Sequence, residues 1–344
     1  MRPTAIRRPL TITAWLVMSI LCLVLSPLML ALAALASAVI RRPQPLLVAR
    51  LVIAYFAREL GVLTGCGVLW LITGCGWRIH SPPSQRLHYR LLGWFAHGMA
   101  QRGLTLLDID VAPEPSPQAT QSLELDRPLL FFSRHAGPGD TVVLIDLLMT
   151  RYRRLPSVVF KDTLTIDPCI DLIAHRLPHA GLDTSDPEES EARIEQVAAA
   201  LDRWGVLVLF PEGGNFSPER RRRSLEKLWR KGRSREAAAG EQMTHVLPPH
   251  PAGALAAIRG NPDCDVIFAA HTGLGVAAFP RELWRHTPIG KTFKTRMWLA
   301  PAAERPREPE AQVRWLYDWW KRLDDWVESQ GEATSVETGP TAAP

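Results

Sequence analysis

A long uncharged stretch near the N-terminus is the feature that most constrains the fold. From Pro9 to Ile40 the sequence contains no charged residue, although about 20 apolar residues are enough for a helix that spans a bilayer. Arginines flank this stretch, and Arg8 and Arg41 are its immediate neighbours. A cleaved signal peptide shares the basic start, but its apolar region is only about 7 to 15 residues long. The stretch therefore predicts membrane helices at the N-terminus.

A second apolar stretch, from Leu60 to Trp77, is close to the minimum length of a spanning helix and contains five glycines. Such a segment can span the bilayer, re-enter it or lie along its surface. We expect residues 1–80 to form a membrane-anchoring helical segment. A domain at residues 81–330 and a disordered tail at residues 331–344 would follow it.

The rest of the chain alternates helical and strand-like patterns. Helical periodicity covers 87–102, 187–203 and 309–330. Strand-like runs cover 104–111, 129–133, 157–160, 205–210, 265–270 and 295–300. The proline-rich segment 112–121 reads as a loop. This alternation predicts an α/β domain with a mostly parallel sheet.

Composition argues against several classes of protein. The net charge of +5 is too small to indicate a nucleic-acid partner. The five cysteines form no Cys-x-x-Cys pair and lack the histidine spacing typical of zinc, so we expect neither a disulfide framework nor a metal site. The sequence also lacks the glycine-rich loops that bind dinucleotides or nucleoside triphosphates. We therefore expect no bound cofactor.

A histidine and an aspartate stand where a predicted strand gives way to a helix. His135 follows the strand and Asp140 opens the helix, with Gly-Pro-Gly at positions 137–139 forcing a tight turn between them. A carboxylate that accepts the N–H of one ring nitrogen leaves the other nitrogen free to take a proton from a hydroxyl. The pair therefore predicts a general base, and no serine or cysteine nucleophile is required.

A second motif, Phe-Pro-Glu-Gly-Gly-Asn at positions 210–215, directly follows another predicted strand. Together with Arg134, His135 and Asp140 it resembles the glycerolipid acyltransferase family, whose first motif is N-H-x4-D and whose third is F-P-E-G-T-R. Residues 177–184 stand where the family has its second, acceptor-binding motif. Residues 245–249 resemble its fourth, proline-containing motif. The order and spacing agree over residues 90–280.

The resemblance implies a glycerolphosphate-acyltransferase-like α/β domain and a role for each motif. His135 would be the base, and Asp140 would orient it. The second and third motifs would bind the acceptor through Glu212, Gly213, Gly214, Asn215, Asp183 and Thr184. Pro249, or the neighbouring Pro248, would belong to the acyl-donor region. Backbone N–H groups near Gly137, Gly139 or Gly213 are candidates for stabilising charge on the carbonyl oxygen.

The implied reaction moves a fatty acyl group from acyl-CoA or acyl carrier protein to a hydroxyl of a lysophospholipid of the lysophosphatidate type. The partners would then be membrane lipids and the acyl donor, with acyl-CoA or acyl-ACP acting as co-substrate. We expect the chain in the inner (cytoplasmic) membrane with its catalytic domain facing the cytoplasm, where acyl thioesters are made.

Departures from the family pattern leave the acceptor open. Ser133 and Arg134 precede the histidine where the family commonly has asparagine. Thr184 and Asn215 stand where the family has arginines, which grip a phosphate through forked hydrogen bonds. A different glycolipid acceptor is therefore an alternative.

Two alternatives come from other functional classes. One is a membrane-anchored hydrolase that uses the same histidine–aspartate pair to activate water, and the other is a non-catalytic lipid-binding scaffold. The four arginines at positions 220–223 either replace the missing cations or form a solvated helix face.

Overall fold

The computed structural model describes residues 4–183, 185–274 and 288–331. Their internal contacts divide the chain into two compact units. The first unit comprises residues 1–109 and 142–190, and the second comprises residues 110–141 and 191–344. The predicted disordered tail, apart from Gly331, lies outside the described residues.

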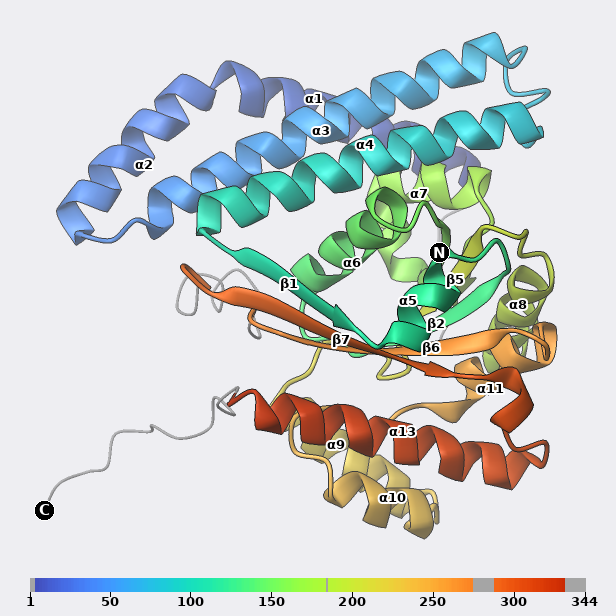
Figure 1. The fold of residues 1–344 in the computed structure, drawn as a ribbon. Coiled ribbons are helices and arrows are strands. Elements are labelled where there is room, and N and C mark those ends of the chain that lie inside the picture. The colour runs from blue at the N-terminus through green and yellow to red at the C-terminus, as the bar shows by residue number, and fades with distance from the viewer. Residues whose placement is uncertain (1–3, 184, 275–287, 332–344) are drawn as a thin grey trace, which may run out of the picture. The chain divides into compact units, whose positions relative to one another are not determined.

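Long helices make up most of the first unit. Helix α3 contacts α1, α2 and α4, and Figure 1 shows these helices running alongside one another. A proline lies in the first turn of α2, α3, α4 and α7, where its missing N–H costs no helical hydrogen bond. The helices are α1 (Thr4–Val24), α2 (Ser26–Ile40), α3 (Gln44–Ile72), α4 (Pro82–Leu107) and α7 (Pro168–Arg176). The parallel strands β3 (Leu155–Lys161) and β4 (Ala180–Leu182) complete this unit, with β3 followed by a short 3₁₀ turn (Asp162–Ile166).

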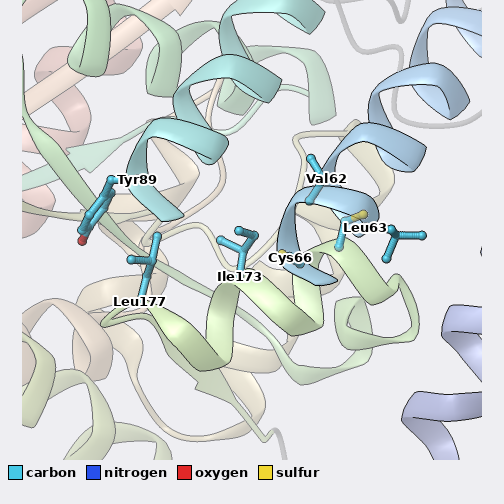
Figure 2. Close-up of a cluster of buried hydrophobic side chains, with 7 residues drawn as sticks. Val62, Leu63, Cys66, Tyr89, Ile173 and Leu177 are labelled. Atoms are coloured by element: carbon cyan, nitrogen blue, oxygen red, sulfur yellow. The ribbon is translucent and has the colours of Figure 1, made fainter. Parts of the chain in front are cut away.

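A small apolar core holds three of these helices together (Figure 2). Cys66 lies one helical turn after Val62 and Leu63 on α3, so the three side chains face the same neighbours. Tyr89 of α4 and Ile173 of α7 pack against them. The amphipathic spacing of α3 therefore fixes where α4 and α7 lie within the unit.

Among the described residues, one helix is long and apolar enough to cross a membrane, Ile6–Val24 within α1. The uncharged stretch from Pro9 to Ile40 is interrupted after Val24, and α2 has Pro27 in its first turn. Helix α2 is apolar but shorter. The second apolar stretch forms the end of α3 and the turn after it. The expectation of several N-terminal membrane helices therefore reduces to one candidate.

The second unit contains a mixed, mostly parallel sheet, which confirms the predicted α/β class. Five of its strands are ordered β1-β7-β6-β2-β5, and only the β6–β7 pair among these neighbours is antiparallel. Every residue of β2, β5 and β6 is buried, as expected for continuous apolar runs covered on both faces. The strands are β1 (Asp110–Pro115), β2 (Leu129–Ser133), β5 (Gly205–Leu209), β6 (Asp265–Thr272) and β7 (Thr292–Ala300).

Helices cover this sheet, and the C-terminal helix α13 contributes most of the aromatic packing. Trp319 stacks on Phe268 of β6 with ring centroids 4.7 Å apart, and Trp320 is fully buried. Leu316, Trp320 and Leu323 are buried on the packing face of α13, whereas Trp319 is only half-buried. The helices that complete the fold are α5 (Pro117–Glu124), α6 (Pro138–Thr150), α8 (Pro187–Ala199), α9 (Pro218–Arg230), α10 (Ser234–Glu241), α11 (Pro251–Gly260) and α13 (Pro309–Ser329), with a 3₁₀ turn at Ala302–Glu304.

Two predictions around residue 110 were wrong. The first half of the expected strand at 104–111 is the end of α4, which continues to Leu107, and only its last two residues belong to β1. The expected loop at 112–121 contains β1 and the start of α5. Prolines are tolerated in β1 because it is an edge strand, paired in this unit with β7 alone. Pro117 occupies the first turn of α5 behind the N-cap Ser116.

Candidate active site

The carboxyl ends of three neighbouring parallel strands bring the polar residues of the second unit together. His135 lies just beyond β2, Glu212 just beyond β5, and His271 near the end of β6. Because β5, β2 and β6 are adjacent and parallel, these ends meet at one edge of the sheet, where loop residues can converge on a ligand. This edge is the candidate active site.

The first motif forms the predicted pair. His135 Nδ1 lies 3.2 Å from Asp140 Oδ1. Asp140 is fully buried, whereas the His135 side chain keeps 19% of its surface accessible. Among the described residues none hydrogen-bonds Nε2 of His135. The arrangement therefore fixes one ring nitrogen and leaves the other for a substrate proton.

The turn between the two residues is held by the same carboxylate. Asp140 Oδ2 accepts the backbone N–H of Ala136 at 2.7 Å and that of Gly137 at 2.8 Å. Burial by itself raises the pKa of Asp140, but His271, His135 and the Gly137 N–H favour the ionised form and lower the pKa to about 2. Asp140 is therefore a permanent negative charge beside the imidazole.

His271 is a site residue that sequence reasoning missed. Its Nε2 lies 3.3 Å from Asp140 Oδ2 and 3.0 Å from the carbonyl oxygen of Arg134. The Arg134 guanidinium donates in turn to the His271 carbonyl at 2.5 Å. Both side chains are buried. The signal available in the sequence was a histidine at the end of a predicted strand, and only the strand order places it next to β2.

Glu212 connects the first, third and fourth motifs. Its Oε1 accepts the backbone N–H of His135, and its Oε2 accepts that of Leu247, both at 3.2 Å. Glu212 is 2% exposed. Burial raises its pKa to about 8, against the lowering effects of Arg134 and of the two N–H groups. At neutral pH the carboxyl group is therefore mostly protonated, and its direct contacts are with the protein backbone.

The rest of the third motif shapes the loop around His135. The Phe210 and His135 rings pack with centroids 4.5 Å apart, and the Phe216 N–H donates to the His135 carbonyl at 2.8 Å. Gly213 has φ +66°, and a Cβ there would lie 2.9 Å from Cδ2 of His250. Glycine is therefore required at this position on both conformational and steric grounds.

The three glycines predicted as oxyanion donors differ in availability. The Gly137 N–H already donates to Asp140, and the Gly213 N–H donates to the Phe210 carbonyl at 3.0 Å. Gly139 lies in the first turn of α6, where backbone N–H groups have no intrahelical acceptor, and none is found for it among the described residues. Of the three, Gly139 is therefore the best-placed donor.

The fourth motif is anchored from two sides. Leu247 donates to Glu212, as above, and Asp324 of α13 accepts the backbone N–H groups of Thr244 and His245 at 3.1 and 2.6 Å. Pro248 and Pro249 are both buried in this loop. Their predicted place in the acyl-donor region stays a prediction.

The second motif belongs to the first unit, where His179 Nδ1 accepts the backbone N–H of Val158 at 2.8 Å and Asp183 makes contacts close in sequence. Asp183 is exposed in the turn after β4, where its Oδ1 accepts the N–H of Ser185 at 2.9 Å and its carbonyl accepts the hydroxyl of Ser190 at 2.9 Å. Thr184 lies outside the described residues. A role for these two residues in acceptor binding stays a prediction.

The four arginines at positions 220–223 have different surroundings on α9. Arg220 donates to the Asn215 carbonyl of the third motif at 3.1 Å. Arg221 donates to the Glu241 carbonyl at 2.9 Å. The last two, Arg222 and Arg223, pair with Glu226 and Glu219 on an exposed helix face. Of the four, Arg220 is therefore the one with an observed contact to the third-motif loop.

A separate polar group in the first unit has the residue types of a metal site. Ligand atoms of Glu59, Asp167 and Cys169 lie within 4.8 Å of one another. However, Asp167 Oδ1 accepts the N–H of Cys169 at 2.8 Å, and Oδ2 accepts the Tyr55 hydroxyl at 2.5 Å. Burial raises the pKa of Cys169, which disfavours the thiolate that binds metals. These contacts describe a buried hydrogen-bonded cluster that caps α7.

Comparison with known proteins agrees with the motif analysis. Residues 111–251 match the family model described as Acyltransferase. This segment contains all four motifs, and it is a domain of the glycerolipid acyltransferase family. Neither the curated proteins nor the solved structures contain a significant match to the chain.

Proposed function

We propose that this acyltransferase is membrane-bound and moves a fatty acyl group from acyl-CoA or acyl carrier protein to a hydroxyl of a lysophospholipid. The observation that carries the proposal is the His135–Asp140 pair, in which a buried charged carboxylate orients an accessible imidazole. The accessible nitrogen suits proton removal from an alcohol, because no nucleophilic side chain is needed between base and substrate.

The proposed reaction follows from that geometry. Nε2 of His135 takes the proton of the acceptor hydroxyl as its oxygen attacks the thioester carbonyl carbon. Asp140 holds the Nδ1–H and stabilises the imidazolium that forms. The Gly139 N–H faces the developing oxyanion. The tetrahedral intermediate then expels the thiolate, which receives the proton from Nε2, so the products are an ester and a free thiol.

The acceptor is proposed to differ from lysophosphatidate in how its headgroup is recognised. Thr184 and Asn215 stand where the family has arginines, and Arg220 supplies a cation beside the Asn215 carbonyl instead. A guanidinium binds a phosphate through charge-assisted hydrogen bonds. The proposal also includes a different glycolipid as the acceptor.

The apolar helix Ile6–Val24 supports attachment to a membrane. The proposed location is the inner (cytoplasmic) membrane, with the catalytic domain facing the cytoplasm. The protein should stay with membranes during a carbonate wash, and deletion of residues 1–42 should release it. A mature protein that begins near Ala38, or protease digestion of the domain from outside intact cells, would contradict this topology.

Thiol release tests the reaction itself. The full-length protein in detergent is incubated with acyl-CoA or acyl carrier protein, with and without a panel of lysophospholipids that differ in headgroup. Transfer predicts thiol release that depends on an acceptor and produces an equal amount of acylated lipid. Thiol release of the same rate without any acceptor would instead identify the hydrolase alternative.

A further inference from the structure

A pocket of about 870 Å³ lies within the first unit. Its walls come from α1, from the end of α3 and the turn after it, and from α7. We name it the basic pocket, and its lining includes Arg8, Ile12, Leu16, Gly67, Leu172 and Arg176. Leu63, which also lines it, belongs to the apolar core in Figure 2.

The polar side of the basic pocket is positively charged. Arg8 and Arg176 line it together with two histidines, and no aspartate or glutamate occurs among its described lining residues. Asp171 lies beside it and accepts from two arginines, from Arg7 at 2.8 Å and from Arg8 at 2.7 Å. One carboxylate therefore faces two guanidinium groups, and the local charge stays positive.

Arg8 also has hydrogen-bonding capacity left over. Its Nε is bound to Asp171, but its Nη2 is buried and has no acceptor among the described residues. A buried guanidinium N–H without an acceptor is unfavourable. An anionic oxygen that entered the pocket would supply that acceptor.

Beyond Arg8, the part of the pocket wall that α1 provides is apolar. Ile12 and Leu16 follow Arg8 at spacings of four and eight residues, so all three lie on one face of α1. At 1.5 Å per residue this face extends about 12 Å from the charge into apolar surroundings. The face belongs to the helix Ile6–Val24, which is long and apolar enough to cross a membrane, and Arg8 lies near its start.

We propose that the basic pocket binds one anionic glycerophospholipid of the membrane, with its phosphate at Arg8 and Arg176 and an acyl chain along Ile12 and Leu16. An arginine near the end of a spanning helix lies at the depth of the lipid headgroups, so a lipid phosphate is the anion available there. This site goes beyond the proposed reaction, because it assigns a lipid to the first unit and not to the catalytic histidine.

A cavity-filling variant tests the proposal. Gly67 lines the basic pocket, and a Cβ at this position meets no atom within 4 Å, so Gly67→Leu fills the pocket without a clash. Gly103→Leu is the matched control, because Gly103 also lies in a helix with an open Cβ position but does not line the pocket. Binding of phosphatidylglycerol and phosphatidylcholine to the full-length protein in neutral detergent is measured by native mass spectrometry.

We expect one phosphatidylglycerol bound about tenfold more tightly than phosphatidylcholine, with Gly67→Leu reducing that binding about tenfold and Gly103→Leu leaving it unchanged. Equal binding of the two lipids, or equal binding by the two variants, would overturn the proposal.

A second pair of variants tests the charge independently. Arg7→Gln and Arg8→Gln each remove one contact to Asp171, but of the two only Arg8 lines the pocket. Selective loss of phosphatidylglycerol binding in Arg8→Gln supports the proposal, and equal effects of both variants overturn it. His135 is unchanged in all four variants, so failure of this proposal leaves acceptor-dependent thiol release intact and is distinguishable from failure of the proposed reaction.

Discussion

The first and third motifs each bury one carboxyl group, and the two groups differ in ionisation at neutral pH. Asp140 is 0% exposed and Glu212 is 2% exposed, so burial does not distinguish them. Yet the pKa of Asp140 is lowered to about 2, while that of Glu212 is raised to about 8. At neutral pH the first is an anion and the second is mostly neutral.

The difference lies in the partners. Asp140 faces the imidazoles of His135 and His271 and also accepts two backbone N–H groups. Glu212 accepts two backbone N–H groups as well, but no imidazole of the described residues is hydrogen-bonded to it, and the attraction of Arg134 does not overcome its burial. The comparison teaches that backbone donors alone do not keep a buried carboxyl group ionised here. The anion lies where the imidazolium forms, and the neutral group holds loops together.

The largest effect is expected from removal of His135, the base that the Asp140 carboxylate orients. His135→Ala should lower thiol release by about 10² to 10⁴-fold without unfolding the protein, because a general base contributes about that much. His97→Ala is the control, since His97 forms another histidine–aspartate pair, 3.0 Å from Asp146, in the first unit. Activity near the wild-type level in His135→Ala would refute the assignment.

Asp140→Asn should have a smaller effect than His135→Ala, because it spoils the orientation and tautomer of the imidazole without deleting it. The amide keeps an oxygen for the Ala136 and Gly137 N–H groups but loses the negative charge. The rate is measured as kcat, with Asp146→Asn as the control. A loss equal to that of His135→Ala would show that the anion is as essential as the base itself.

Glu212→Gln tests whether the carboxyl group of Glu212 is protonated in the folded protein, through the pH dependence of the free energy of unfolding. Between the ordinary pKa of about 4.5 and the folded value of about 8, the folded protein holds a proton that the unfolded chain has released. Wild-type stability should therefore fall as pH rises through this window, by at most about 1.4 kcal/mol per pH unit. The buried Glu59, whose pKa is raised to about 7, contributes a slope of the same sign below that pH. Glu212→Gln should therefore make the slope less steep, most clearly between pH 7 and 8, and Glu219→Gln, at an exposed position of α9, should leave it as in the wild type.

Denaturant unfolding at pH 5, 6, 7 and 8 measures the slope in each variant. If the slope in Glu212→Gln equals that of the wild type between pH 7 and 8, the carboxyl group of Glu212 is ionised in the folded protein, and the contrast with Asp140 disappears.

The strands and loops that carry these two carboxyl groups were largely predictable from the sequence. The apolar runs predicted β2 at 129–133 with the bounds observed, and β5, β6 and β7 within three residues at each end. The loops that carry His135 and Glu212 follow directly from those strands. Such short-range patterns succeed because an apolar run bounded by glycine or proline has few alternatives.

The other contacts of the site depend on the order of the strands in the sheet, which the hydrophobic periodicity of the sequence does not specify. His271 joins Asp140 because β6 lies beside β2, although more than a hundred residues separate them in the chain. The edge position of β1 likewise made its prolines acceptable in a strand. The partners that set the two pKa values are therefore tertiary contacts, and the sequence alone predicted neither charge state.

The smallest expected effect concerns the cation next to the third-motif loop. Arg220→Gln removes the hydrogen bond to the Asn215 carbonyl and one positive charge, so the KM for an anionic acceptor should rise about two- to tenfold with little change in kcat. Arg222→Gln is the matched control, because Arg222 belongs to the same run but lies exposed and pairs with Glu226 at 3.8 Å. Equal changes in both variants would mean that the run acts as a diffuse charge at the surface. A preference for lysophosphatidate that survives both substitutions would refute the role of Arg220 in place of the missing arginines.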